Sequence, residues 1–189
     1  MKLLAILSLV ACMTMACNAA DRASQIDDIR EATFRYQFVK NASMQQTSAK
    51  VYFLSLTDLE KHRGLDPSDV FMKRFDGHKP RVAKASQAKT SIEDGARDAK
   101  TGEDGIIFSI YEINWKSDSE VEVAGGYYEG SESASYNTYY LVKKGGKWIV
   151  ERNVMHTISL NTPNQALQHN DPSCHESCLR TPRASRARG

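Results

Sequence analysis

The chain lacks four short motifs that identify common catalytic, nucleotide-binding or redox sites. A phosphate-cradling glycine-rich loop, a Gly-x-Ser-x-Gly elbow, a His-Glu-x-x-His pair and a Cys-x-x-Cys pair are all missing from the 189 residues. The glycine pairs that it does contain lie inside or between strand-like runs, where glycine is typical of turns and bends. The sequence therefore favours a protein without catalytic activity, and we expect no cofactor.

Clustered basic charge is missing from the body of the chain. The formal net charge is +2, of which Lys2 contributes +1 and the segment from Gln168 onward contributes +2, leaving −1 on residues 18–167. A nucleic-acid surface needs grouped lysines and arginines to neutralise phosphates. We therefore expect no nucleic-acid partner.

No apolar run reaches the ~20 residues that a membrane-spanning helix needs. The run Leu3–Ala11 follows the single charge of Lys2 and precedes small residues at 16–20. This three-part layout is typical of a secretory signal peptide. Residues 1–20 are therefore predicted to direct export to the periplasm or outer membrane of a bacterium, with membrane attachment only through a lipid.

Only four cysteines are present, and two of them lie in this export segment. Residues 1–20 resemble a bacterial lipoprotein signal, which ends in a small residue followed by the cysteine that receives the lipid. Both Cys12 and Cys17 follow an alanine, and Cys17 leaves the fuller signal, so it is the preferred lipidation site. The alternative is ordinary cleavage after Ala19 or Ala20, which would discard both cysteines.

The other two cysteines, Cys174 and Cys178, lie near the end of the chain. In an oxidising compartment such a pair favours a disulfide. Together with His169 and His175 they also offer four metal-ligating atoms, although the spacing matches no familiar zinc or copper site. No metal is therefore predicted. Residues 164–189 are rich in Arg, Ser and Pro, which predicts a disordered basic tail that is either solvated or touches anionic lipid.

Residues 21–163 are predicted to form a single α+β domain. Apolar side chains at helical spacing indicate the first helix, and alternating patterns separated by turn residues indicate the strands. The expected elements are a helix at 25–40, a strand at 51–56, a short helix at 67–75 begun by Asp66, an edge strand at 80–87, a loop or hairpin at 90–104, and four antiparallel strands at 105–115, 120–129, 135–143 and 147–159.

Gly125 and Gly126 interrupt the second of these four strands. A glycine pair there favours a bulge or bend that curls the sheet, so we expect the long helix to pack inside a curved antiparallel sheet, as a cone or roll. This order of elements resembles the nuclear-transport-factor-2-like superfamily, and a cystatin-like roll explains it equally well. The chain departs from that superfamily in lacking a second helix directly after the first.

Tyrosines are concentrated in the predicted strands, and a curved sheet closed by a helix can leave a cavity. Tyr36, Tyr111, Tyr127 and Tyr140 are the candidate ligand-binding residues, the alternative being aromatic core and cross-strand pairs. The first hypothesis is accordingly an exported, non-catalytic domain that binds a small apolar ligand or an envelope protein. The sequence does not indicate its oligomeric state.

Two other functions stay open. The resemblance permits an isomerase or dehydratase, with His156 as the general base and Glu112, Glu129 or Asp69 as its orienting partner. An exposed His156 above a filled core would argue against it. The third hypothesis, inhibition of a secreted enzyme, needs a projecting apolar hairpin, and the polar turn at 130–135 suits that role poorly.

Overall fold

The computed structural model describes residues 2–41, 43, 47–58, 63–131 and 133–158, with the side chains of residues 2–20, 58, 63, 157 and 158 outside that description. The predicted signal and the side chain of Cys17 therefore stay untested. Cys174, Cys178 and the predicted tail at 164–189 also lie outside the described residues.

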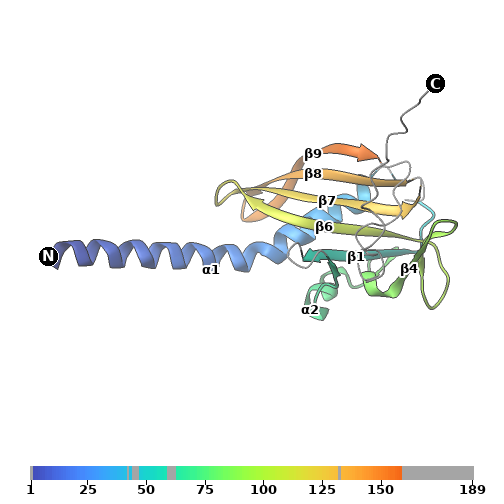
Figure 1. Ribbon diagram of the computed structural model, residues 1–189, viewed down its shortest axis with the longest axis horizontal. Helices are drawn as coiled ribbons and strands as arrows, with labels where there is room; N and C mark the ends of the chain where they lie inside the picture. Colours follow the sequence, from blue (N-terminus) through green and yellow to red (C-terminus); the bar gives the residue numbers. More distant parts are fainter. Residues whose placement is uncertain (1, 42, 44–46, 59–62, 132, 159–189) are drawn as a thin grey trace, which may run out of the picture.

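One long helix lies against one large sheet, which confirms the α+β class (Figure 1). The first half of the chain forms α1 (Lys2–Val39), β1 (Val51–Asp58), β2 (Arg63–Leu65), α2 (Asp69–Met72), η1 (Lys73–Phe75), β3 (Arg81–Lys84) and η2 (Ala85–Gln87). The second half forms β4 (Ala88–Ser91), β5 (Gly95–Asp98), β6 (Gly105–Trp115), β7 (Glu120–Gly130), β8 (Ser133–Lys144) and β9 (Lys147–Ile158).

The main sheet is mixed, which corrects the antiparallel sheet predicted from the sequence. Its strand order is β2-β1-β6-β7-β8-β9, and β3 also pairs with β1. The last four strands form the expected antiparallel meander, whereas β1 runs parallel to both β3 and β6. Parallel neighbours need a crossover connection, and the segment holding α2 and the separate β4–β5 hairpin is the connection between β1 and β6.

Helix α1 covers the buried face of this sheet. It is longer than the predicted 25–40, because it runs unbroken from Lys2 to Val39. Ile29, Phe34 and Phe38 on its apolar stripe are buried, and Phe34 packs edge-on against Phe75, with 6.4 Å between ring centroids. Burying one such side chain contributes about 1.5–3 kcal/mol, so the stripe fixes α1 on the sheet.

The second helix is shorter than predicted and begins at a different residue. Ser68, rather than Asp66, caps it, because the Ser68 hydroxyl accepts a hydrogen bond from the backbone N–H of Phe71 at 3.2 Å. The Asp66 carboxylate instead accepts two hydrogen bonds from Ser86. A four-residue α-helix then tightens into the 3-10 turn η1, so the predicted stretch at 67–75 divides into two short pieces.

The glycine pair lies opposite an irregularity in the neighbouring strand. The register between β6 and β7 shifts between Ile110 and Glu112, leaving Tyr111 as an extra residue beside Gly125. A Cβ on Gly125 would lie 2.6 Å from the carbonyl oxygen of Ser109, closer than ordinary contacts allow. The predicted bulge is therefore present, with the inserted residue on β6 rather than on β7.

Candidate functional site

The four tyrosines predicted to line one pocket do not meet. Tyr36 and Tyr127 lie on the inner side, where the Tyr36 hydroxyl donates to Asn153 Oδ1 at 3.0 Å and Tyr127 is almost fully buried. Burial raises the pKa of Tyr127. Tyr111 and Tyr140 belong to the opposite, outer face of the sheet. The structure therefore divides the predicted ligand-binding set between two faces.

On the outer face the aromatic side chains form cross-strand pairs. The ring of Tyr111 stacks on Tyr136 with 5.8 Å between centroids and an interplanar angle of 15°. The guanidinium of Arg152 lies 3.4 Å above the ring of Tyr140. Such contacts each contribute roughly 0.5–1.5 kcal/mol. Tyr140 and Arg152 are direct partners on the neighbouring strands β8 and β9, whereas the Tyr111–Tyr136 stack joins β6 to β8 across Gly126 of β7.

His156 is exposed and extends this aromatic row. Its ring lies 5.6 Å from that of Tyr136, and its Nε2 is 2.8 Å from the hydroxyl of Thr138. Two of its three proposed carboxylate partners are engaged elsewhere: Asp69 pairs with Lys84 at 2.6 Å, which lowers the pKa of Asp69, and Glu129 accepts hydrogen bonds from two serines. The third, Glu112, lines a groove beside α1. These described contacts do not assemble a catalytic group around His156.

A buried polar cluster that the sequence analysis missed lies inside the domain. The side-chain amide of Gln37 on α1 reaches the hydroxyl of Tyr139 on β8 at 3.1 Å, and the Asn137 amide donates to the same hydroxyl at 3.1 Å. Burial raises the pKa of Tyr139 to about 12, although both hydrogen bonds act in the opposite direction. Gln37 lies within the apolar stripe of α1, and a polar residue at such a position could have indicated a buried polar cluster.

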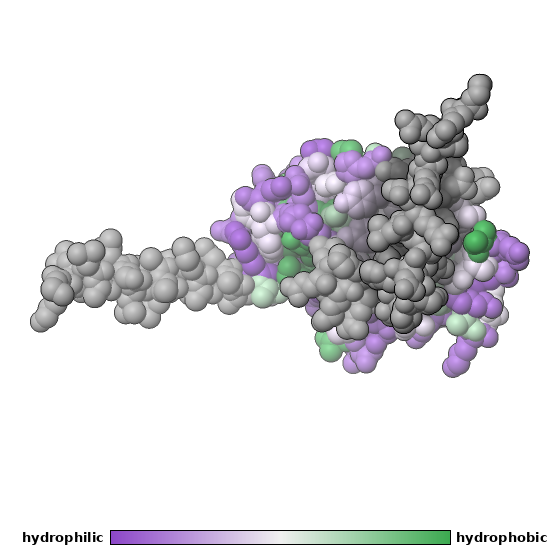
Figure 2. Space-filling view, in the orientation of Figure 1, coloured by the Kyte–Doolittle hydropathy of each residue, from purple (hydrophilic) through white to green (hydrophobic). Residues whose placement is uncertain are grey.

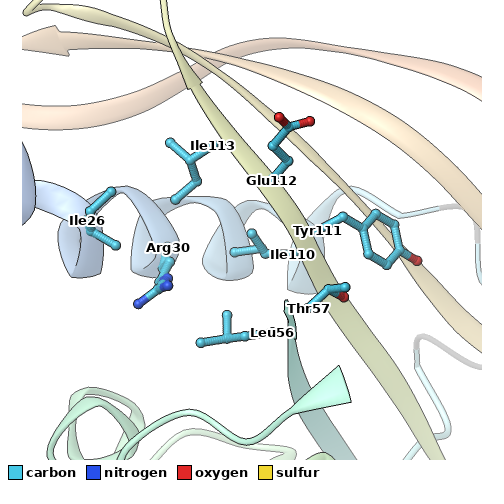
Figure 3. Close-up of a pocket in the computed structure, with 8 residues that line it drawn as sticks. All are labelled: Ile26, Arg30, Leu56, Thr57, Ile110, Tyr111, Glu112 and Ile113. Atoms are coloured by element: carbon cyan, nitrogen blue, oxygen red, sulfur yellow. The ribbon is translucent and has the colours of Figure 1, made fainter. Parts of the chain in front are cut away.

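A groove with both aliphatic and polar lining residues lies between α1, the end of β1 and the irregular part of β6. Figure 3 shows the aliphatic side chains grouped on one side of β6, while the ring of Tyr111 points away from them. The groove has a volume of about 150 Å³. Its lining residues are Ile26, Arg30, Leu56, Thr57, Ile110, Tyr111, Glu112 and Ile113.

Arg30 is the basic residue of this groove, and Glu112 is the acidic one. The guanidinium of Arg30 bonds to Asp27 one turn earlier, with Nη1 and Oδ1 3.2 Å apart. The Nε of Arg30 is buried and has no hydrogen-bond partner among the described residues. Arg30 therefore has unused hydrogen-bond donors beside aliphatic side chains. Such a combination can bind an apolar group that has a hydrogen-bond acceptor next to it.

Figure 2 shows mostly hydrophilic residues, with a hydrophobic area beside α1 where the helix meets the sheet.

Across the described part of the chain, no three His, Cys, Asp or Glu side chains gather closely enough to hold a metal ion. Among the same residues, no helix is both long enough and apolar enough to cross a membrane.

No protein-family model, curated protein or solved structure is similar to the chain.

Proposed function

We propose that this chain is an exported, non-catalytic binding domain of the bacterial envelope. It is held at the membrane through a lipid on Cys17, and it binds a partner protein by taking one of its apolar side chains into the groove beside α1. The fold is a roll of the nuclear-transport-factor-2-like kind. The aliphatic lining and small volume of the groove carry this proposal.

The volume favours a protein partner over a small molecule. Pockets for small organic ligands occupy about 300–1,000 Å³, whereas this groove holds about 150 Å³, enough for one aliphatic side chain. Burying such a side chain contributes about 1.5–3 kcal/mol. That is the scale of a single anchor residue at a protein interface, and it is too little for tight binding of a free metabolite.

The positive charge of Arg30 indicates which group of the partner should lie next to the apolar anchor side chain. Arg30 shares one hydrogen bond with Asp27 and has further donors. A partner that places a carboxylate or a backbone carbonyl beside its apolar anchor would satisfy one of them. Hydrogen bonds from a charged donor contribute about 1.5–3 kcal/mol, so this contact selects among partners with similar anchors.

Removal of the export segment is compatible with the fold. Among the described side chains of α1, contacts with the sheet begin at Arg22, whose guanidinium lies 2.9 Å from Asp118 and 5.1 Å from the Trp115 ring. Gln25 follows, with its Oε1 accepting a hydrogen bond from Trp148 at 3.1 Å. Processing at Cys17 or after Ala20 would leave all of these contacts in place.

Site-specific photo-cross-linking in the intact envelope tests the binding function. A small diazirine-bearing amino acid at Thr57, which lines the groove, is compared with the same amino acid at exposed Lys89, which does not. We expect one discrete protein adduct at Thr57 that disappears when Ile26→Trp fills the groove. Adducts that are equal at both positions, or that persist in Ile26→Trp, would contradict the proposal.

A further inference from the structure

A second cleft, larger than the groove, lies between β3 and the turn from β5 to β6. Its volume is about 460 Å³, within the range of pockets that hold small organic ligands. The side chains around it are almost all polar or charged: Arg81, Gln87, Asp98, Lys100, Thr101 and Glu103.

The turn that forms one wall of this cleft is fixed by its own hydrogen bonds. Each backbone N–H from residue 98 to residue 103 donates to an acceptor within the domain. The carboxylate Oδ1 of Asp98 accepts two of them, from Lys100 and Thr101, both at 2.8 Å. The wall is therefore rigid, and its backbone has no N–H left for a ligand.

Asp98 also orients the arginine on the opposite wall. Its second oxygen, Oδ2, accepts a hydrogen bond from Arg81 Nη2 at 2.7 Å. The Asp98 side chain is only 6% exposed, whereas that of Arg81 is 48% exposed. The hydrogen bond from Thr101, followed by those from Arg81 and Lys100, lowers the pKa of Asp98 to about 2. The carboxylate is thus charged at neutral pH and holds the guanidinium in place.

The unused hydrogen-bonding groups decide which ligand the cleft fits. Arg81 has donors beyond the one given to Asp98, and neither the ammonium of Lys100 nor the amide of Gln87 bonds to another described residue. Both oxygens of Asp98 are occupied. One oxygen of Glu103 accepts from the hydroxyl of Thr101 at 3.0 Å. The available groups are mainly cationic donors, so they fit an anion rather than a cation.

We infer that this cleft binds a small organic molecule through a carboxylate or phosphate group held between Arg81 and Lys100. The guanidinium suits either group because its N–H donors form a planar fork that matches two oxygens at once. Lys100 adds a mobile point charge, and Asp98 is the positioning residue that aims Arg81. This site is separate from the groove beside α1 and does not depend on the function proposed for that groove.

Titration of the purified protein with sodium phosphate, and separately with sodium acetate, tests the inference. Heteronuclear NMR follows the Arg81 Nε–H and the backbone amides of residues 98–103, with ionic strength held constant by sodium chloride because salt screens such contacts. We expect saturable shifts with one or both anions at millimolar concentration. Saturation by phosphate identifies a phosphate ester as the ligand class, and saturation by acetate a carboxylate. The absence of saturable shifts with both anions would overturn the inference.

Three variants separate a specific site from general electrostatic attraction. Lys100→Gln, which removes no described contact, and Arg81→Lys, which keeps the charge but loses the fork, should each weaken binding about tenfold. Lys89→Gln removes one exposed charge from the adjacent strand β4 without touching the cleft, and should change binding less than twofold. Equal weakening of anion binding by all three variants would show that the anion is attracted by the overall positive charge, and it would refute a specific site.

Discussion

The side-chain amide of Gln37 on α1 donates a hydrogen bond to the hydroxyl of Tyr139 on β8, with 3.1 Å between Nε2 and the phenolic oxygen. Both side chains are 1% exposed. The same amide also lies 3.3 Å from the carbonyl oxygen of Ser109. This contact therefore ties the helix to strands β6 and β8 through polar groups in the interior, where unmade hydrogen bonds cost most.

Removing the hydroxyl of Tyr139 should destabilise the domain. In Tyr139→Phe the amides of Gln37 and Asn137 lose a shared acceptor in a buried site. We expect a loss of about 1–3 kcal/mol in the free energy of unfolding, measured by urea denaturation. Tyr136→Phe is the control, because Tyr136 is 44% exposed. Equal effects of the two substitutions would show that the buried cluster has no special role.

Tyr139 should make the free energy of unfolding depend on pH in the alkaline range. The folded pKa of Tyr139 is about 12 against an ordinary value of 10.0, so the unfolded chain releases this proton first. The stabilising contribution is complete below pH 10 and falls as the pH rises towards 12, by at most about 3 kcal/mol.

A comparison of wild type with Tyr139→Phe isolates this effect from the other tyrosines. We expect the stability advantage of the wild type, measured by urea denaturation at several pH values, to shrink between pH 10 and pH 12. An advantage that stays constant over this range would mean that Tyr139 ionises alike in both states.

Adding a methyl group at Gly125 should damage the sheet. The new Cβ would lie 2.6 Å from the Ser109 carbonyl oxygen and 3.2 Å from Gln37 Nε2, so backbone must move. We expect Gly125→Ala to cost about 1–3 kcal/mol in urea denaturation. Gly130→Ala on the same strand is the matched control, since its nearest neighbour would be at 3.6 Å. A similar cost at Gly130 would remove the evidence for close packing at Gly125.

The intact mass of the envelope-purified protein tests the export prediction. Lipidation at Cys17 predicts a chain that begins at this cysteine and carries acyl groups, and Cys17→Ser should abolish them. Cys12→Ser is the control and should leave the lipid in place. An unmodified chain that begins at residue 20 or 21 would instead establish cleavage after Ala19 or Ala20.

The meander was predictable because its signals are local. Apolar and acidic residues alternate along the second strand, with Val121 and Val123 between Glu120 and Glu122, and this pattern predicts a strand. The glycine pair at 145–146 predicts the turn of a hairpin. Neither prediction needs knowledge of the rest of the chain. Both of those turn glycines have positive φ. The predicted boundaries of these four strands accordingly differ from the observed ones by at most two residues, whereas the edge strand predicted at 80–87 ends at Lys84.

The parallel pairing and the candidate sites depend on distant contacts. Nothing within Val51–Asp58 specifies a parallel neighbour, because that pairing is set by the path of the chain through β3 to β6. The insertion of Tyr111 turns its ring to the outer face, away from the aliphatic side of the groove. Alternation alone cannot reveal such a shift, so tyrosines chosen by pattern fell on both faces.

The affinity of the cross-linked partner for purified variants tests the proposed binding function most directly. Ile26→Trp fills the groove, whereas Ile92→Trp adds the same bulk at an exposed position, 70% exposed and outside the groove. We expect Ile26→Trp to weaken binding at least about tenfold, since an anchor side chain contributes about 1.5–3 kcal/mol, and Ile92→Trp to leave it unchanged. A partner that binds wild type and Ile26→Trp equally well would contradict the assignment of the groove.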